Sequence, residues 1–376
     1  MVLADRGVSQ LMNDFQVEEI PQIPIRKRLR PCCAFGSDIQ AKVGPIPVPF
    51  YRIPNLLGSD ELGKHSYDSG ILEARYGEGR RVGASEERNG LVYTCRGGFI
   101  DTAHVRDYVD WTAFVATRIA ATFEKGGTIE LGEEGGAKRL VVRPLDPDVI
   151  ERIGWRRLAA WLSRWSGFQL SVWHEIATWY GWAAVPGFSE RASSFSPEDL
   201  YSNLIGAKLT MAIIHRRAAR TEKLYNASVA AWMEEVLEHL GAVPASVGRD
   251  AAAAVDGLWW DSNARVPDNR LVLRRNFDVG ERIEPWLVPD ALAPPSLRAA
   301  CGGTPAPLGL SNPSQREEVD FGRWVTLEIE VGEELAAHAP FAEIGPIVTH
   351  EEFPQLIEAI RSEARDELGP HVDRRD

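Results

Sequence analysis

An adjacent histidine–glutamate pair, His174-Glu175, is the pattern in this sequence most typical of catalytic chemistry. It lies in a short run that also contains Trp173, Trp179 and Tyr180. Ionisable side chains beside so much aromatic surface cost free energy unless they are paired, ligated or hydrogen-bonded. Because ligand pockets usually combine aromatic walls with a few convergent polar groups, the sequence predicts an aromatic-lined pocket centred on this pair.

The pair begins like the zinc-binding motif H-E-x-x-H, in which two histidines hold the ion and the glutamate acts as general base. Thr178 stands where that motif has its second histidine. The remaining ligands would therefore come from other parts of the chain. Glu198 and Asp199, at the start of the next predicted helix, are suitably placed for this role.

A second group of acids around a histidine consists of Asp101, His104 and Asp107. Their spacing of three residues puts them on one face of a predicted helix. A carboxylate beside a histidine can form a ligand pair with it or orient it from the second shell of a metal site. His104 is therefore the second histidine that a metal site could use.

These residues together favour a metal-dependent hydrolase. We predict a divalent metal such as zinc held by His104, His174 and Asp199, with Glu175 as general base for a bound water. Seven further side chains are predicted to complete the pocket: Asp101, Asp107, Thr178, Trp173, Trp179, Tyr180 and Glu198.

Each of these residues also has a purely structural interpretation. His174 can be a core histidine bonded to a carbonyl group, with Glu175 paired to an arginine. Asp101 suits a helix N-cap, Asp199 suits a helix N-terminus, and Asp107 suits the protein surface. The rival function is a non-catalytic protein whose tryptophan-lined cleft binds a small molecule or a peptide.

The cysteines suggest a third function. Cys32, Cys33, Cys95 and Cys301 have no spacing typical of a zinc site or a disulfide framework. Free thiols in a reducing compartment are the simplest interpretation. Cys95 shortly precedes a predicted helix, where a thiolate would be stabilised, so a thiol hydrolase with a histidine base is the remaining alternative.

The elements that must position these residues are mainly helical. Apolar spacing and capping residues predict helices at 101–126, 148–166, 168–182, 198–221, 227–240 and 353–367. Alternating patterns predict strands at 91–95, 128–131, 139–142 and 324–331. The proline-rich segment 31–57 is predicted to be extended chain packed over a surface. The predicted fold is mainly α (α+β), a helical core with a small β-hairpin and edge strands, as one domain at 31–376 after a flexible arm at 1–30.

The composition restricts the partners and the location. A formal net charge of −12 over 376 residues argues against nucleic-acid binding, which needs a basic surface. No apolar run is long enough to span a bilayer, and residues 1–30 lack the apolar segment of a secretory signal. The sequence therefore predicts a soluble, cytoplasmic protein, with an exported form as the alternative if a signal precedes it.

Four strings of the sequence are long and specific: RPCCAFG at 30–36, NGLVYTCRGGFIDTAH at 89–104, HEIATWYG at 174–181 and SSFSPEDLYSN at 193–203. Together they resemble a bacterial family catalogued only as a domain of unknown function, number 4056. The resemblance extends from about residue 31 to residue 331. It implies a fold and a site shared with that family, but no reaction.

Overall fold

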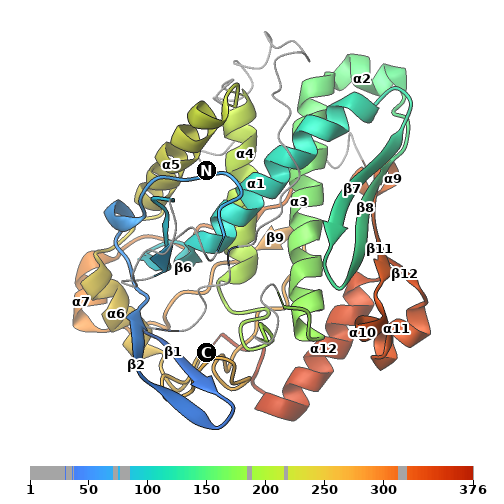
Figure 1. Cartoon of the computed structure of the whole chain (residues 1–376). Coiled ribbons are helices and arrows are strands. Elements are labelled where there is room, and N and C mark those ends of the chain that lie inside the picture. Colours follow the sequence, from blue (N-terminus) through green and yellow to red (C-terminus); the bar gives the residue numbers. More distant parts are fainter. Residues whose placement is uncertain are drawn as a thin grey trace.

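The structure is a computed structural model that describes residues 30, 36, 38–70, 75–76, 85–183, 189–215, 219–311 and 320–375 (Figure 1). Its longest helices are α1 (Thr102–Ile119), α3 (Trp155–Trp179), α4 (Asp199–His215), α5 (Glu222–His239) and α12 (Phe353–Leu368). Shorter helices are α2 (Pro147–Ile153), α6 (Ala245–Ala254), α7 (Pro295–Ala300), α9 (Phe321–Trp324), α10 (Glu333–Ala336) and α11 (Ala339–Ile344). The strands are β1 (Asp38–Val43), β2 (Ile46–Pro54), β3 (Arg75–Tyr76), β4 (Arg88–Asn89), β5 (Leu91–Thr94), β6 (Gly98–Asp101), β7 (Gly127–Glu133), β8 (Gly136–Val142), β9 (Arg282–Ile283), β10 (Leu308–Gly309), β11 (Val325–Val331) and β12 (Ile347–Thr349). Helices combined with small sheets make this an α+β fold, as predicted.

Helix α1 lies at the centre of the helical core, between α4 and α3 (Figure 1). Every residue of α1 except Arg118 is buried, including its polar residues. Buried polar groups need hydrogen-bond or ion-pair partners, because water cannot satisfy them. Several polar side chains of α1 are paired with side chains from other elements: Arg106 donates to the Asn89 side chain, and Asp110 accepts a hydrogen bond from the Tyr225 hydroxyl.

The sequence predicted two helices separated at Gly167, and this break is wrong. Helix α3 continues through Gly167 to Trp179. A Cβ atom at Gly167 would overlap the Thr112 hydroxyl of α1. The glycine is therefore explained by the close approach of two helices and not by a helix end. The break lies instead at Gly154, which has a φ of 90° and separates α2 from α3.

The helix predicted at 198–221 also needs correction, since α4 ends at His215 and residues 216–218 lie outside the described residues. Thr221 is the N-cap of α5, where its hydroxyl accepts a hydrogen bond from the Leu224 N–H. Threonine favours such caps over helix interiors. The strand predicted at 91–95 is present as β5, but Gly97-Gly98 turns the chain into a second strand, β6, that the prediction missed.

A four-stranded antiparallel sheet, in the order β12-β11-β8-β7, lies beside α3 (Figure 1). Its β7–β8 hairpin and strand β11 confirm the strands predicted from alternating patterns. Leu140 on β8 faces Leu327 on β11, and both side chains are buried. The turn between β7 and β8 is the part of the sheet that reaches the candidate site.

The segment predicted as extended chain contains the antiparallel hairpin of β1 and β2. The arm predicted at 1–30 lies outside the described residues except for Arg30, which is 2% exposed. Its guanidinium contacts Glu87, Asp107 and Asp110. Arg30, the last residue of the predicted flexible arm, is therefore buried and held by three carboxylates.

A disulfide joins Cys95, directly after β5, to Cys301, directly after α7. The prediction of free thiols is wrong for these two residues, and Cys32 and Cys33 lie outside the described residues. A sulfur held in a disulfide is not a nucleophilic thiolate, which removes the proposed Cys95 mechanism. The pairing was not visible in the sequence because 206 positions separate the two cysteines.

Within the described part of the chain, no helix combines the length and the apolar character needed to cross a bilayer.

The contact between α1 and α4 gives a testable prediction for Gly206. A Cβ atom there would overlap the carbonyl oxygen of Val105, and backbone atoms cannot rotate away. Gly206→Ala is therefore expected to lower the free energy of unfolding by about 1–3 kcal/mol, the usual cost of overpacking. Urea unfolding measures the effect.

Gly248→Ala in α6 is the matched control, because its added Cβ atom would lie 3.4 Å from Leu56 Cδ1. This variant should be neutral or more stable by up to about 1 kcal/mol, since alanine favours helix over glycine. Equal destabilisation by both substitutions would contradict the role assigned to Gly206.

Candidate functional site

The first turn of α1 fixes the position of His104. The Asp101 carboxylate caps the helix by accepting hydrogen bonds from the Ala103 N–H at 2.7 Å and the His104 N–H at 3.1 Å. The Asp101 N–H in turn donates to the Ser202 hydroxyl of α4 at 2.9 Å. The N-cap predicted for Asp101 is therefore present, and it joins the start of α1 to α4.

His104 on α1 and His174 on α3 face one another, with ring centroids 5.9 Å apart and ring planes at 85°. His104, His174 and Glu175 each offer one ligand atom, and these atoms lie within 4.8 Å of one another. Asp101, His104 and Asp199 form a second group with the same property. The structure thus brings the two predicted histidines together and places predicted acids on both sides of His104.

Asp199, the first residue of α4, contacts His104 directly. Its Oδ1 atom lies 3.1 Å from His104 Nδ1, and its Oδ2 atom accepts a hydrogen bond from the Ser196 N–H at 2.8 Å. Burial lowers the pKa of His104, but the charges of Asp199 and Asp101 outweigh this effect and hold the pKa well above its usual value. Asp199 therefore connects the N-terminus of α4 to the ring of His104.

Glu134 and Lys138 belong to the site but were not predicted. Glu134 Oε1 lies 2.5 Å from His174 Nδ1, and its other oxygen forms an ion pair with Lys138. The Glu134 carbonyl accepts a hydrogen bond from the Trp173 indole, which fixes the β7–β8 turn against α3. The sequence has no pattern that predicts a contact between Glu134, in a glycine-rich turn, and His174. The contact follows only from the packing of the sheet against α3.

The contact between His174 and Glu134 shifts the pKa values of both residues. Burial raises the pKa of Glu134, but the positive charges of Lys138 and His174 outweigh it and bring the pKa to about 2. Burial lowers the pKa of His174, but Glu134 outweighs it and raises the pKa to about 9. Without a bound cation, His174 and Glu134 are therefore a charged pair at neutral pH, and a metal ion at His174 would displace a ring proton.

Glu175 points into the loop between α3 and α4. Its Oε2 atom accepts a hydrogen bond from the Phe195 N–H at 2.7 Å, and its Oε1 atom is buried without a hydrogen-bond partner. Phe195 has a φ of 56°, which is rare for a bulky residue and marks backbone strain. Burial and the Asp199 charge raise the pKa of Glu175 to about 7, although the two nearby histidines act in the opposite direction.

Glu198 adds a further buried carboxyl group beside Asp199. Both of its carboxyl oxygens are buried. Burial, followed by the charges of Asp199 and Asp101, raises the pKa of Glu198 well above its usual value.

The predicted aromatic wall is part of the protein core. Trp173 stacks on Phe353 with ring centroids 6.0 Å apart, and the Trp179 indole donates to Glu363 Oε2 at 2.8 Å. The Tyr180 hydroxyl donates to the other Glu363 oxygen at 3.3 Å. These three side chains therefore attach α3 to other elements instead of lining an open pocket.

Two other predicted pocket residues have structural partners. The Thr178 hydroxyl donates to the His174 carbonyl at 2.9 Å, within its own helix. Asp107 forms an ion pair with Arg30 at 2.8 Å, so it is not a surface charge. The aromatic ring that does lie beside His174 is that of Trp182, with centroids 5.9 Å apart.

Solvent reaches the cluster at one side chain. The His174 side chain is 14% exposed, whereas His104 is 2% and Glu175 is 1% exposed. A ligand or an ion would therefore approach the cluster from the side of His174 and Trp182.

Fold and site together define an α+β protein with a buried cluster of histidines and carboxylates between its central helices. Residues 20–289 match the family described as "Protein of unknown function (DUF4056)", and the chain belongs to this family. The whole cluster falls within the matched residues, whereas β11, β12 and α12 follow them. No curated protein and no solved structure matches the chain.

Proposed function

We propose that His104, His174 and Glu175 hold a divalent metal ion such as zinc, and that the protein is a metal-dependent hydrolase. The observation that carries the proposal is the convergence of ligand atoms from these three residues within 4.8 Å. The Nε2 atom of His104 and the Oε1 atom of Glu175 are buried without a hydrogen-bond partner. Leaving such groups unsatisfied costs about 1–3 kcal/mol each, and a bound cation would remove that cost for the carboxylate and for one ring nitrogen.

The surroundings of both histidines support a metal site. His174 Nδ1 contacts Glu134 at 2.5 Å, and His104 Nδ1 contacts Asp199 at 3.1 Å. Histidine ligands of metals usually have their second ring nitrogen held by a carboxylate or a carbonyl group. The Nε2 atoms of both rings are therefore the proposed ligands.

This proposal differs from the sequence-based prediction in the roles of the two acids. Asp199 was predicted as a ligand and is now proposed to orient His104, since its two oxygens already contact His104 and the Ser196 N–H. Glu175 was predicted as a base and is now proposed as the third ligand. Two ligands about 2.1 Å from one tetrahedral ion are roughly 3.4 Å apart, so ligand atoms that lie up to 4.8 Å apart would approach one another by about 1.4 Å at most when the site closes.

Two histidines and one glutamate leave a fourth position for water, which is the ligand set of many catalytic zinc sites. When bound there, the ion would activate this water and polarise the bond to be cleaved. The chain itself contributes the fixed histidines and an approach past His174 and Trp182. Trp173 and Trp179, which favoured a non-catalytic ligand cleft, are buried by protein, so the metal site is the better-supported function.

The disulfide bears on the location of the protein. A bond between Cys95 and Cys301 is typical of an oxidising compartment. It supports an exported protein over the cytoplasmic one predicted from the sequence.

Metal binding is the direct test of the proposal. Protein purified without chelators should contain or take up about one zinc ion per chain, measured by elemental analysis and by calorimetric titration with Zn²⁺ alone. His174→Ala and Glu175→Gln should each abolish this binding, whereas His350→Ala, a half-buried histidine beside Trp165, should not. Metal far below one equivalent that His174→Ala leaves unchanged would refute the site.

A paired substitution in one turn tests the role of Glu134. Glu134→Gln should weaken zinc binding about 10–100-fold, the usual loss when the second-shell partner of a metal ligand is removed. Glu133→Gln, at the exposed neighbouring position, should leave zinc affinity unchanged. Equal affinities of the two variants would contradict the orienting role of Glu134.

Hydrolysis is tested separately with an activated carboxylate ester and an activated phosphate diester. Cleavage of either that depends on zinc and is absent in His174→Ala supports the proposed reaction. Stoichiometric zinc without cleavage of either substrate would refute the hydrolase and leave a structural metal site.

A further inference from the structure

Trp182 lies beside the ring of His174, at the side where solvent reaches the histidine cluster. Among the described residues, the His174 ring contacts Glu134 at 2.5 Å and the rings of His104 and Trp182 at centroid distances of 5.9 Å each. Glu134 is 4% exposed and His104 is 2% exposed, whereas Trp182 is only partly buried. A molecule that approaches the cluster past His174 would therefore contact the indole of Trp182.

The end of helix α3 fixes the backbone of Trp182. Gly181 has a φ of 101°, a conformation that favours glycine. Its N–H donates to the Thr178 carbonyl at 3.1 Å, and the Trp182 N–H donates to the Ala177 carbonyl at 3.0 Å. These two hydrogen bonds form a Schellman motif, which holds the residue after the glycine against the last turn of the helix. The motif therefore keeps Trp182 close to His174, a residue of the same helix.

The indole N–H of Trp182 has no acceptor among the described residues. By contrast, the N–H groups of Trp173, Trp179 and Trp259 donate to protein acceptors at 2.8, 2.8 and 3.2 Å. Buried indole N–H groups usually have such a partner, and tryptophan is common where one end of the ring system is apolar and the other is wet. Trp182 therefore offers an apolar ring and a hydrogen-bond donor at the same place.

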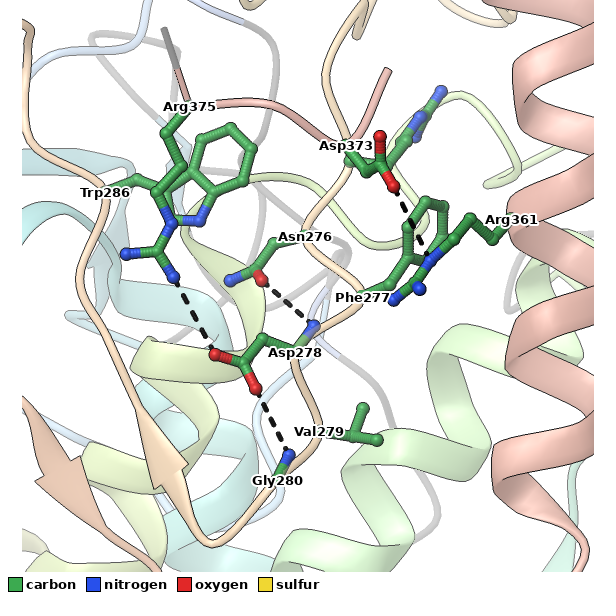
Figure 2. Close-up of a pocket in the computed structure, with 10 residues that line it drawn as sticks. Asn276, Phe277, Asp278, Val279, Gly280, Trp286, Arg361, Asp373 and Arg375 are labelled. Atoms are coloured by element: carbon green, nitrogen blue, oxygen red, sulfur yellow. Dashed lines mark hydrogen bonds and ion pairs between the residues drawn. The ribbon is translucent and has the colours of Figure 1, made fainter. Parts of the chain in front are cut away.

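The cavity between the segment 275–286, helix α12 and the segment 373–375 has a volume of about 370 Å³ and lies apart from this approach (Figure 2). Its lining contains neither histidine of the cluster, nor Glu175, nor Trp182. A metal-dependent hydrolase must hold the bond that is cleaved at its ion, so this cavity cannot hold the reacting group. Contacts that select the substrate are therefore expected at the exposed side of His174.

We propose that Trp182 selects the substrate of the proposed hydrolase, and that this substrate carries a flat apolar ring close to the bond that is cleaved. The inference rests on the proposed metal site, whose open fourth position would hold the reacting group. Aromatic rings attract one another in offset-stacked or edge-to-face contacts. Because the indole lies only 5.9 Å from the ring of a proposed metal ligand, a ring attached within a few bonds of the reacting group would contact it.

Two hydroxamic acids that differ in one group are suitable probes. Acetohydroxamic acid and benzohydroxamic acid both bind zinc through the same two oxygen atoms, and only the second carries a flat ring. In calorimetric titrations of the zinc-loaded full chain, benzohydroxamate should bind about tenfold more tightly, the order expected from one aromatic contact. Trp182→Ala should remove this preference and leave the affinity for acetohydroxamate unchanged. Trp155→Ala, at the other end of α3, is the control and should keep the preference.

Two further measurements test the flat ring itself. Trp182→Phe retains an aromatic ring and should keep most of the preference for benzohydroxamate. Cyclohexanecarbohydroxamic acid has a ring of similar size that is not flat, so it should bind the wild type more weakly than benzohydroxamate does. Equal binding of these two acids would overturn the assignment of a flat ring.

The outcomes separate this inference from the proposed function. Equal binding of acetohydroxamate and benzohydroxamate, or an unchanged preference in Trp182→Ala, would overturn the role of Trp182 and leave the metal site in place. If neither hydroxamate binds the zinc-loaded protein, the ion has no open position, and the proposed hydrolase and the role of Trp182 are both refuted. Urea unfolding of each variant establishes that it is folded.

Discussion

Replacing Arg30 with methionine is expected to lower the free energy of unfolding by about 3–5 kcal/mol at neutral pH, the usual effect of breaking a buried ion pair. The Arg30 side chain is fully buried and contacts Glu87 at 2.8 Å, Asp107 at 2.8 Å and Asp110 at 3.0 Å. Without the guanidinium, three carboxylates would remain in the interior with too few donors. Methionine retains most of the volume, so the lost charge dominates the effect.

The size of this effect should depend on pH. Burial raises the pKa of Glu87, but the charges of Arg30 and Arg106 outweigh it and hold the pKa well below its usual 4.5. A carboxyl group with a depressed pKa stabilises the folded state above its unfolded pKa and loses this contribution as the pH falls through its folded pKa. Arg30→Met removes the largest of these lowering charges. The difference between wild type and variant should therefore be largest near neutral pH and shrink at acidic pH.

Urea unfolding of both proteins over a range of pH values measures this difference. Arg139→Met is the control, because Arg139 pairs with Glu328 at a position where both side chains are partly exposed. Such pairs contribute about 0–1 kcal/mol. A loss in Arg30→Met no larger than in Arg139→Met, or one that does not change with pH, would contradict the role assigned to the Arg30 cluster.

The elements that could be predicted from the sequence are those with local signals. Asp101 caps α1 as expected, because an N-cap depends on residues within one turn. Strand β11 and helix α12 follow from alternating and helical apolar spacing over single segments. Gly167 was misinterpreted because glycine marks a helix end and a close helix contact equally well. Only the neighbouring helix decides between the two.

The interactions that could not be predicted join distant positions. Arg30 and Glu87 are 57 residues apart, and Glu134 and His174 are 40 residues apart. No local pattern relates such residues, so the partners appear only when the elements pack. The tryptophans around His174 were assigned to a pocket wall because dense aromatic residues are typical of both pockets and cores. Helix α12 buries them, and its contribution was not visible in their spacing.

The disulfide should provide the other large contribution to stability. It joins Cys95 and Cys301 across 206 positions, beside a cluster of apolar side chains that includes Trp259, Trp260 and Trp286. A cross-link that closes so long a loop restricts the unfolded chain strongly, and the chain-entropy model gives about 5 kcal/mol, at the upper end of measured values. Replacing both cysteines with serine is therefore expected to lower the free energy of unfolding by about 2–5 kcal/mol.

Reductant separates this effect from a packing defect at the serines. Wild-type protein in reductant should lose about as much stability as the double variant has lost, because both lack the cross-link. The double variant itself should be insensitive to reductant. Urea unfolding gives the stabilities, and thiol labelling with mass spectrometry shows whether the bond is reduced. If labelling shows reduction of Cys95 and Cys301 and the wild type keeps its full stability, the cross-link contributes nothing; the stability of the fold then rests on its core and its buried ion pairs alone.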